Sequence, residues 1–193
     1  MFIISGKYRG HKIKTIRSQN YRPTTSKIKE SIFSILSSGQ FVDDSGRSVL
    51  DGAVIIDVFG GTGALTFEAI SRGAKKGIIV EKDQTNLELL KDNIKTLNFD
   101  EKIIALYGNA CNLSKNSEEC DIAFVDPPFN QGLISKTLDN LLHKGWVKDG
   151  GLIVIERQLQ DLYTAREDCN LVFSRKYGKV WLEVLQKLEK KCS

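Results

Sequence analysis

Residues 54–65 read VIIDVFGGTGAL, an apolar run that passes into a glycine-rich turn and then into a helix-forming sequence. A continuous run of Val and Ile is typical of a parallel strand that is buried on both faces. Glycines at 60, 61 and 63 let the backbone approach a ligand that a Cβ atom would block. The helix that follows would present unpaired N–H groups to that ligand. The pattern predicts a strand–turn–helix unit with a binding site at the turn.

The glycine spacing separates three kinds of loop. A P-loop needs Gly-Lys followed by Ser or Thr, a sequence that the chain lacks. A dinucleotide-binding fingerprint that starts at Gly61 has Gly or Ala at position 66, where this chain has Thr66. What remains is D-x-F-x-G-x-G, formed by Asp57, Phe59, Gly61 and Gly63, which resembles the S-adenosylmethionine loop of class I methyltransferases. A nicotinamide dinucleotide and a plain tight turn stay open as alternatives.

A second apolar run, residues 77–81 (GIIVE), ends in an acid. Glu81 lies 20 positions after Gly61. In open sheets of this kind an acid about 20 residues after the glycine turn accepts hydrogen bonds from ribose hydroxyls. We therefore expect Glu81 to bind a ribose, with a solvated strand-end carboxylate as the alternative.

Composition limits the class of protein. The chain has 193 residues and 41% hydrophobic content, enough for one core with a small extension. No apolar run approaches the roughly 20 residues of a membrane span, and the start does not resemble a signal peptide. The four cysteines form no CxxC pair, and with two histidines they give no zinc signature. We expect a cytoplasmic, monomeric protein with free thiols and no metal.

Charge is concentrated at the start of the chain. Residues 1–29 contain eight Lys or Arg and no acid, although the whole chain carries only +4. A basic arm on a slightly acidic body is typical of proteins that contact phosphates. The candidate contacts are Lys7, Arg9, Lys12 and Arg22, and a solvated extension is the alternative.

The order of the predicted elements indicates an α/β fold. Residues 1–36 are predicted as a small β-hairpin (2–5 and 11–16) followed by a helix, whose Lys29 we place outside the apolar stripe. Residues 37–52 form a polar connector, and residues 53–193 alternate strands with helices. The predicted strands are 54–58, 77–81, 103–107, 121–126, 151–156, 170–176 and 179–188. The predicted helices are 65–72, 132–143 and one that runs through residue 97 with Asp83 as its N-cap. This pattern predicts a Rossmann-like, seven-stranded, mostly parallel sheet with helices on both faces and a terminal antiparallel hairpin.

The most specific motif is residues 124–129, FVDPPF. Two prolines cannot continue a strand ladder, so they fix the Asp126 carboxylate and the Pro127 carbonyl in space. These two acceptors suit the hydrogens of an exocyclic NH₂ group, and the Phe129 ring can stack on the planar substrate that carries it.

Taken together, these motifs resemble the RsmD family of bacterial 16S ribosomal RNA guanine-N2 methyltransferases. The match rests on residues 5–10 (SGKYRG), 22–25 (RPTT), 57–65 (DVFGGTGAL), Glu81, 109–110 (NA), 125–129 (VDPPF) and 177–178 (YG). It covers nearly all of the chain. The connector at 37–52 departs from it and reads as a surface insertion.

The resemblance implies a role for each matching residue. Asp57, Gly61 and Gly63 would hold the methionine part of S-adenosylmethionine, Glu81 its ribose, and Asn109 with Ala110 its adenine. Phe59 and Ala64 would also belong to the cofactor site. Asp126 and Pro127 would bind the target amine, Phe129 would stack, and the hairpin with Arg22 and Thr24 would lie against the RNA. The implied partner is 16S rRNA in a 30S subunit or assembly intermediate, and the cofactor product is S-adenosylhomocysteine.

The type of acceptor gives a partial check on the base. Guanine presents two neighbouring donors, N1–H and N2–H₂, which suit the acceptor-only carboxylate of Asp126. Adenine presents an acceptor beside its N6 donor, which suits an amide better. Guanine is therefore favoured. An adenine-N6 methyltransferase acting on RNA or DNA, and a noncatalytic RNA-binding protein of the same fold, remain the alternatives.

Overall fold

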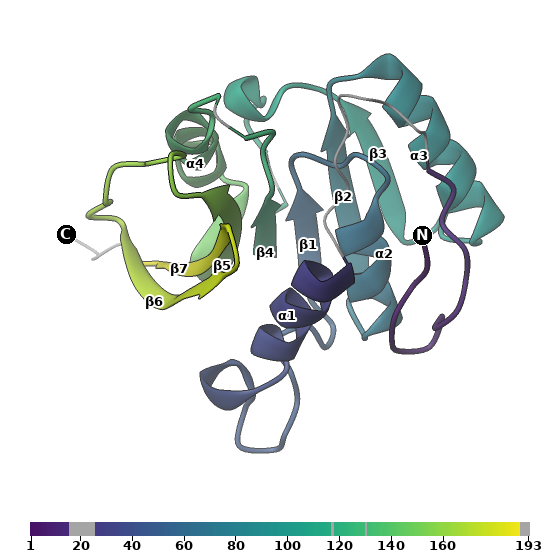
Figure 1. The fold of residues 1–193 in the computed structure, drawn as a ribbon, viewed down its shortest axis with the longest axis horizontal. Coiled ribbons are helices and arrows are strands. Elements are labelled where there is room, and N and C mark those ends of the chain that lie inside the picture. Colours follow the sequence, from purple (N-terminus) through teal and green to yellow (C-terminus); the bar gives the residue numbers. More distant parts are fainter. Residues whose placement is uncertain (16–25, 117, 130, 190–193) are drawn as a thin grey trace.

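A seven-stranded sheet forms the centre of the computed structural model, which describes residues 1–15, 26–116, 118–129 and 131–189 (Figure 1). Its order is β3-β2-β1-β4-β5-β7-β6. The strands are β1 (Val54–Asp57), β2 (Lys76–Glu81), β3 (Ile103–Tyr107), β4 (Cys120–Val125), β5 (Val147–Gln158), β6 (Cys169–Tyr177) and β7 (Val180–Lys187). The predicted strands are confirmed to within a few residues, β5 excepted.

The pairing of the strands confirms the predicted fold class. β1 pairs parallel with both β2 and β4, and β2–β3 and β4–β5 are parallel too. β7 runs antiparallel to β5 and β6, as the terminal hairpin requires. Because the chain moves outward from β1 in both directions, the strand order reverses between β1 and β4. Ligands of open α/β sheets bind at the carboxyl ends of strands at such a point.

Strand β5 begins four residues earlier than predicted. The pair Gly150-Gly151 reads as a strand start in the sequence, but the register with β4 shifts between Cys120 and Ile122, where β5 carries extra residues. Gly150 has φ +75°, a conformation that favours glycine. The glycines therefore form an irregularity within the strand and do not begin it.

Helices cover both faces of the sheet. α1 (Ser26–Leu36), α2 (Ala64–Ser71) and α3 (Gln84–Thr96) pack on one face, where Phe33, Phe67 and Leu90 share a core with Ile55 of β1. α4 (Ile134–His143) packs on the other, where Leu138 meets Ile56. We call the first of these the α1 face. Two short 3₁₀ turns, η1 (Gly39–Phe41) and η2 (Ala110–Asn112), complete the described elements.

The N-terminal hairpin is present in a reduced form. Residues 1–13 pair antiparallel through Ile3 N–H to His11 O, Gly10 N–H to Ile3 O and Ile13 N–H to Met1 O, with one β-bridge between Phe2 and Lys12. Ile3 and Ile13 are fully buried in the core of the α1 face. The hairpin thus folds against the main sheet, which supplies the apolar contact that so small a hairpin lacks by itself.

Polar side chains of α2 fix this N-terminal arm. All eight residues of α2 are buried, including Glu68. Glu68 accepts hydrogen bonds from Ile4 N–H (2.8 Å) and Ser5 N–H (2.9 Å). The Ser71 hydroxyl donates to Ser5 O and accepts from Tyr8 N–H (2.9 Å), and its carbonyl accepts from Lys7 N–H (2.8 Å). The arm is therefore held at the far end of the helix that begins at the glycine turn.

Lys29 is buried, which corrects its predicted place outside the apolar stripe of α1. Its ammonium donates to Phe2 O (3.0 Å) and lies 3.5 Å from the Glu68 carboxylate, with no exposed surface. Burial lowers the pKa of Lys29, and Glu68 opposes that shift. A cation can occupy this position because a buried carboxylate and a carbonyl receive it.

Two features are absent from the described residues. Within these residues, no helix has the length and apolarity needed to cross a bilayer. In the same ranges, no group of three or more His, Cys, Asp or Glu side chains is placed to hold a metal ion. Cys111, Cys120 and Cys169 carry free thiols.

Candidate active site

The glycine turn follows directly on β1. Gly60 N–H donates to Val80 O (3.0 Å) and Gly63 N–H to Gly60 O (2.7 Å), and φ is +51° at Gly61 and +79° at Gly63. A Cβ at Gly60 would stand 2.2 Å from Ile79 Cγ2, and one at Gly63 would stand 2.7 Å from the Phe67 ring. Packing within the protein therefore demands these two glycines. The sequence argument, which ascribed them to ligand approach, missed this cause.

Glu81 ties this turn to the end of β2. One carboxylate oxygen accepts from Gly61 N–H (2.8 Å) and the other from Asp83 N–H (2.8 Å). The side chain is buried, with 8% of its surface exposed. Glu81 thus lies beside the glycine turn, as the spacing predicted. Its contact with a ribose stays a prediction.

Asp57, the last residue of β1, carries a buried carboxylate with a raised pKa. Only 2% of its surface is exposed, and it accepts a hydrogen bond from Phe59 N–H at 3.3 Å. Burial raises the pKa of Asp57 to about 7, and the nearby charges of Asp126 and Glu81 raise it further, against the effect of the Phe59 N–H. The pocket therefore favours a proton or another positive group beside this carboxylate.

Asp126 follows the last residue of β4, the strand next to β1. Asp57 is in register with Phe124, two positions before Asp126. Pro127 is buried, while Asp126 and Phe129 are partly exposed. The predicted acceptor motif thus lies one strand from the predicted donor site.

Asn109 and Ala110 lie just beyond β3. Gly108 N–H donates to the Glu81 carbonyl (3.0 Å), which brings this segment next to the end of β2. The Asn109 side chain accepts from Cys111 N–H (2.9 Å) and caps η2, while Ala110 is buried. The candidate adenine residues therefore stand at the same edge of the sheet as Glu81.

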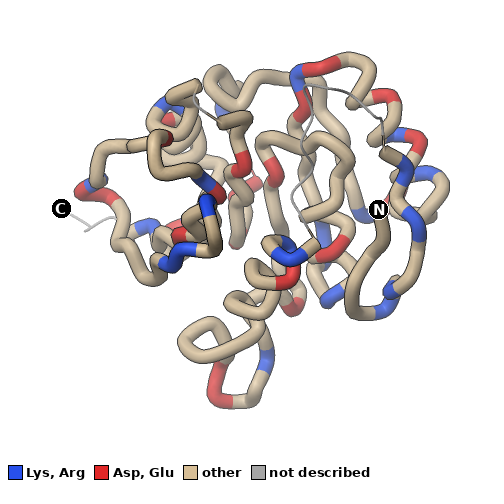
Figure 2. The backbone as a smooth tube through the Cα atoms, in the orientation of Figure 1, with Lys and Arg blue, Asp and Glu red and all other residues tan. Residues whose placement is uncertain are grey.

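The predicted nucleic-acid residues lie elsewhere. Lys7, Arg9 and Lys12 are exposed on the N-terminal arm, which is held at the end of α2 opposite the glycine turn. Figure 2 shows basic segments along this arm, the purple chain of Figure 1. Arg22 and Thr24 lie outside the described residues. The structure thus groups the cofactor and acceptor candidates and leaves the basic arm apart from them.

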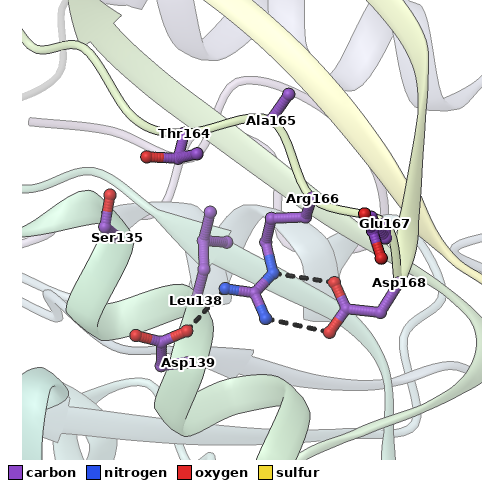
Figure 3. Close-up of a pocket in the computed structure, with 8 residues that line it drawn as sticks. All are labelled: Ser135, Leu138, Asp139, Thr164, Ala165, Arg166, Glu167 and Asp168. Carbon is purple, nitrogen blue, oxygen red and sulfur yellow. Dashed lines mark hydrogen bonds and ion pairs between the residues drawn. The ribbon is translucent and has the colours of Figure 1, made fainter.

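A separate hollow of about 520 Å³ lies between the start of α4 and the loop before β6 (Figure 3). Its cation, Arg166, pairs with both oxygens of Asp168 (2.8 and 2.9 Å) and with Asp139. The guanidinium is neutralised by these carboxylates, so the hollow offers little attraction to an anion. We assign it no role.

The sequence motifs left out one acid near the carboxyl end of a parallel strand. Glu156 lies near the end of β5, where it directly follows Ile155, the register partner of Val125. It is buried, with 5% of its surface exposed. Its signal was the same as that of Glu81: a carboxylate that ends a run of Val, Leu and Ile.

The donor set of the site suits a cationic ligand that also carries hydroxyls. Three carboxylates, from Asp57, Glu81 and Asp126, come from three adjacent strands, and burial disfavours the charged form of the first. S-adenosylmethionine carries a sulfonium and an ammonium group, so its charges fit this edge of the sheet.

Comparison with known proteins identifies the family. The family model described as conserved hypothetical protein 95 matches residues 1–186. The chain belongs to this family, the RsmD family. "Ribosomal RNA small subunit methyltransferase D" of Buchnera aphidicola (subsp. Acyrthosiphon pisum) is 36% identical over 159 residues, covering 82% of this chain and 78% of that protein. The protein of the same name in Haemophilus influenzae is 31% identical over 188 residues, covering 95% and 92%.

A solved structure supports the same assignment. The putative methyltransferase yhhF from Escherichia coli superposes with a TM-score of 0.83 at 30% identity, covering 98% of this chain and 99% of that one. The likeness spans the N-terminal arm, the sheet and the terminal hairpin. The two chains therefore share the architecture described above.

Proposed function

We propose that this chain transfers a methyl group from S-adenosylmethionine to the exocyclic N2 amine of a guanine in small-subunit ribosomal RNA. The observation that carries the proposal is the register of neighbouring strands β1 and β4, in which Asp57 pairs with Phe124, two positions before the DPPF segment. This pairing would hold a methyl donor beside an acceptor for an amine.

The donor side is built from β1, β2 and β3. Asp57 and the turn around Gly61 would receive the cationic methionine part, Glu81 the ribose hydroxyls, and Asn109 with Ala110 the adenine. When bound, S-adenosylmethionine supplies an activated methyl group on its sulfonium sulfur. Because Glu81 already accepts from Gly61 N–H at 2.8 Å, its carboxylate would connect the turn to the sugar.

The acceptor side is the DPPF segment. The Asp126 carboxylate and the Pro127 carbonyl would accept the N2–H hydrogens of guanine, which localises the nitrogen lone pair and directs it toward the donor site. Phe129 would stack on the purine. The acceleration would come from positioning and fixed electrostatics, so this mechanism involves no covalent enzyme intermediate. A stacked or paired guanine must first turn out of its helix, which costs a few kcal/mol.

The names of the relatives support the RNA substrate, and the carboxylate at Asp126 supports guanine. The test supplies a labelled methyl donor with unmodified 30S particles, naked 16S rRNA and DNA, and then maps the product nucleoside. We expect N2-methylguanosine in small-subunit rRNA. N6-methyladenosine would overturn the base assignment, and donor binding without any transfer would favour a noncatalytic RNA-binding role.

A further inference from the structure

A groove of about 630 Å³ lies between α1 and β6 on the α1 face of the sheet. Its lining includes Lys27 and Ser34 of α1 and Phe173, Arg175 and Tyr177 of β6. The volume is that of a small-molecule or nucleotide site. Tyr177 belongs to the Tyr-Gly pair that the sequence analysis singled out without a role.

Strand register connects this groove to the acceptor site. Glu156 of β5 pairs with Leu182 of β7, which pairs with Arg175 of β6. Asp126 and Glu156 each follow one member of the pair Val125 and Ile155. Asp126, Glu156, Leu182 and Arg175 therefore form one row across the sheet. Three strand spacings of about 4.8 Å put the backbone of Arg175 about 14 Å from that of Asp126.

The row also determines which face Arg175 uses. Leu182 is buried in the core of the α1 face, and directly paired residues point to the same face of a sheet. Phe173 and Tyr177, two positions before and after Arg175, pack against that same core. The next residue, Lys176, points to the other face because side chains alternate along a strand.

The chemistry of the groove suits single-stranded nucleic acid. Arg175 lies with its guanidinium 5.4 Å from the centre of the Tyr177 ring, and both side chains line the groove. Within the described residues, neither Lys27 nor Arg175 forms an ion pair with a carboxylate, and Glu30 is the single acid in the lining. Proteins that bind single-stranded nucleic acid place cations at the phosphates and stack aromatic rings on the bases.

We propose that this groove binds the RNA strand next to the target guanine, with Arg175 and Lys27 at its phosphates and Tyr177 against a flanking base. The inference rests on the proposed function. When the target base turns out into the DPPF segment, the neighbouring nucleotides of the same strand remain close by. The distance of about 14 Å between the backbones of Asp126 and Arg175 is one that a few nucleotides span. The row from Asp126 to Arg175 sets this separation.

Charge reversal at adjacent positions tests the proposal. Arg175→Glu removes a cation from the groove, while Lys176→Glu makes the same change of charge on the opposite face. With unmodified 30S particles as substrate, we expect Arg175→Glu to raise KM tenfold or more and Lys176→Glu threefold or less. S-adenosylmethionine affinity, measured by calorimetry, should stay unchanged in both variants. The slope of log KM against log salt should fall by about one in Arg175→Glu alone.

The outcomes separate the groove from the catalytic assignment. Equal effects of the two variants, or no effect of Arg175→Glu, in an enzyme that methylates rRNA would overturn the groove while leaving the function intact. Wild-type protein that methylates no rRNA would overturn both. A photo-crosslinking side chain at Ser34 should capture rRNA from 30S particles. Capture of a ribosomal protein instead would refute an RNA occupant.

Discussion

Replacing Asp57 by Asn removes a buried charge from the proposed cofactor site. The pKa of Asp57 is raised from 3.8 to about 7, which corresponds to about 4 kcal/mol against the ionised form, as an order of magnitude. Since the folded pKa exceeds the unfolded one, the stabilisation that protonation gives is complete below about pH 4 and is lost as the pH rises to about 7. Above pH 7 the carboxylate of the unliganded wild type is ionised, and its burial lowers the free energy of unfolding by the full amount. The Asn variant has no charge at this position and loses none of that stability.

Binding of a cationic methyl donor should reverse the preference of the buried Asp57 side chain for its protonated form. A sulfonium beside Asp57 favours the carboxylate, so the wild type must lose a proton to bind below pH 7. We expect its affinity for S-adenosylmethionine to fall by up to tenfold for each pH unit between 7 and 5. Asp57→Asn should bind more weakly at pH 7.5, show little pH dependence over that range, and unfold with a higher free energy without ligand.

Calorimetric titration from pH 5 to 7.5 measures this slope, and repeating it in buffers of different ionisation enthalpy counts the released protons. Thermal unfolding of both proteins without ligand, over the same pH range, measures how the ionisation of Asp57 changes their stability. If Asp57→Asn keeps the wild-type pH dependence and proton release, the titrating group is not Asp57 and the reasoning fails. A variant less stable than wild type at pH 8 would equally contradict a buried, penalised carboxylate.

Three further substitutions probe the acceptor and the N-terminal arm. Asp126→Ala should abolish turnover, while its affinity for the methyl donor, measured by calorimetry, stays within about tenfold of the wild-type value, or ~1.4 kcal/mol. Loss of donor binding as well would mean that this side chain supports the fold. Glu68→Ala leaves the Lys29 ammonium buried without its carboxylate, so urea unfolding should show a loss of about 3–5 kcal/mol, and a loss below about 1 kcal/mol would refute that pairing. Gly6→Ala puts a Cβ 1.9 Å from the last carbonyl of α2 at φ +81°, and should cost more than about 2 kcal/mol. Gly10→Ala, at φ +84° in open space, is its control and should cost about 1 kcal/mol; equal costs would show that the close contact has no effect.

The sequence predicts well the elements whose causes are local. The buried strands appear in the sequence as runs of Val and Ile. Asp83 was predicted as the N-cap of α3, and its side chain accepts a hydrogen bond from Asn86 N–H at 2.8 Å. The acids at strand ends were placed correctly because parallel strands bring their carboxyl ends to one edge. Asp57, Glu81 and Asp126 meet there for that reason.

Other features depend on contacts between distant residues. Lys29 reads as a surface residue of an amphipathic helix, and its burial depends on Glu68, 39 positions later. The glycine at 63 reads as a ligand contact, yet its space is limited by Phe67 and by Leu90 of α3. The groove depends on α1 and β6, whose nearness follows from the strand order and leaves no periodic signal in either segment.

The docking of the N-terminal arm has a consequence for how the chain folds as it is synthesised. Ile4, Ser5, Lys7 and Tyr8 find their hydrogen-bond partners more than 60 positions downstream, in α2. A nascent chain emerges from its amino end, so this arm is made first but has no binding surface until α2 has emerged. Its isoleucines remain solvent-exposed during that interval. At a synthesis rate of about 5–20 residues per second, the arm therefore stays undocked for several seconds before its native partners exist.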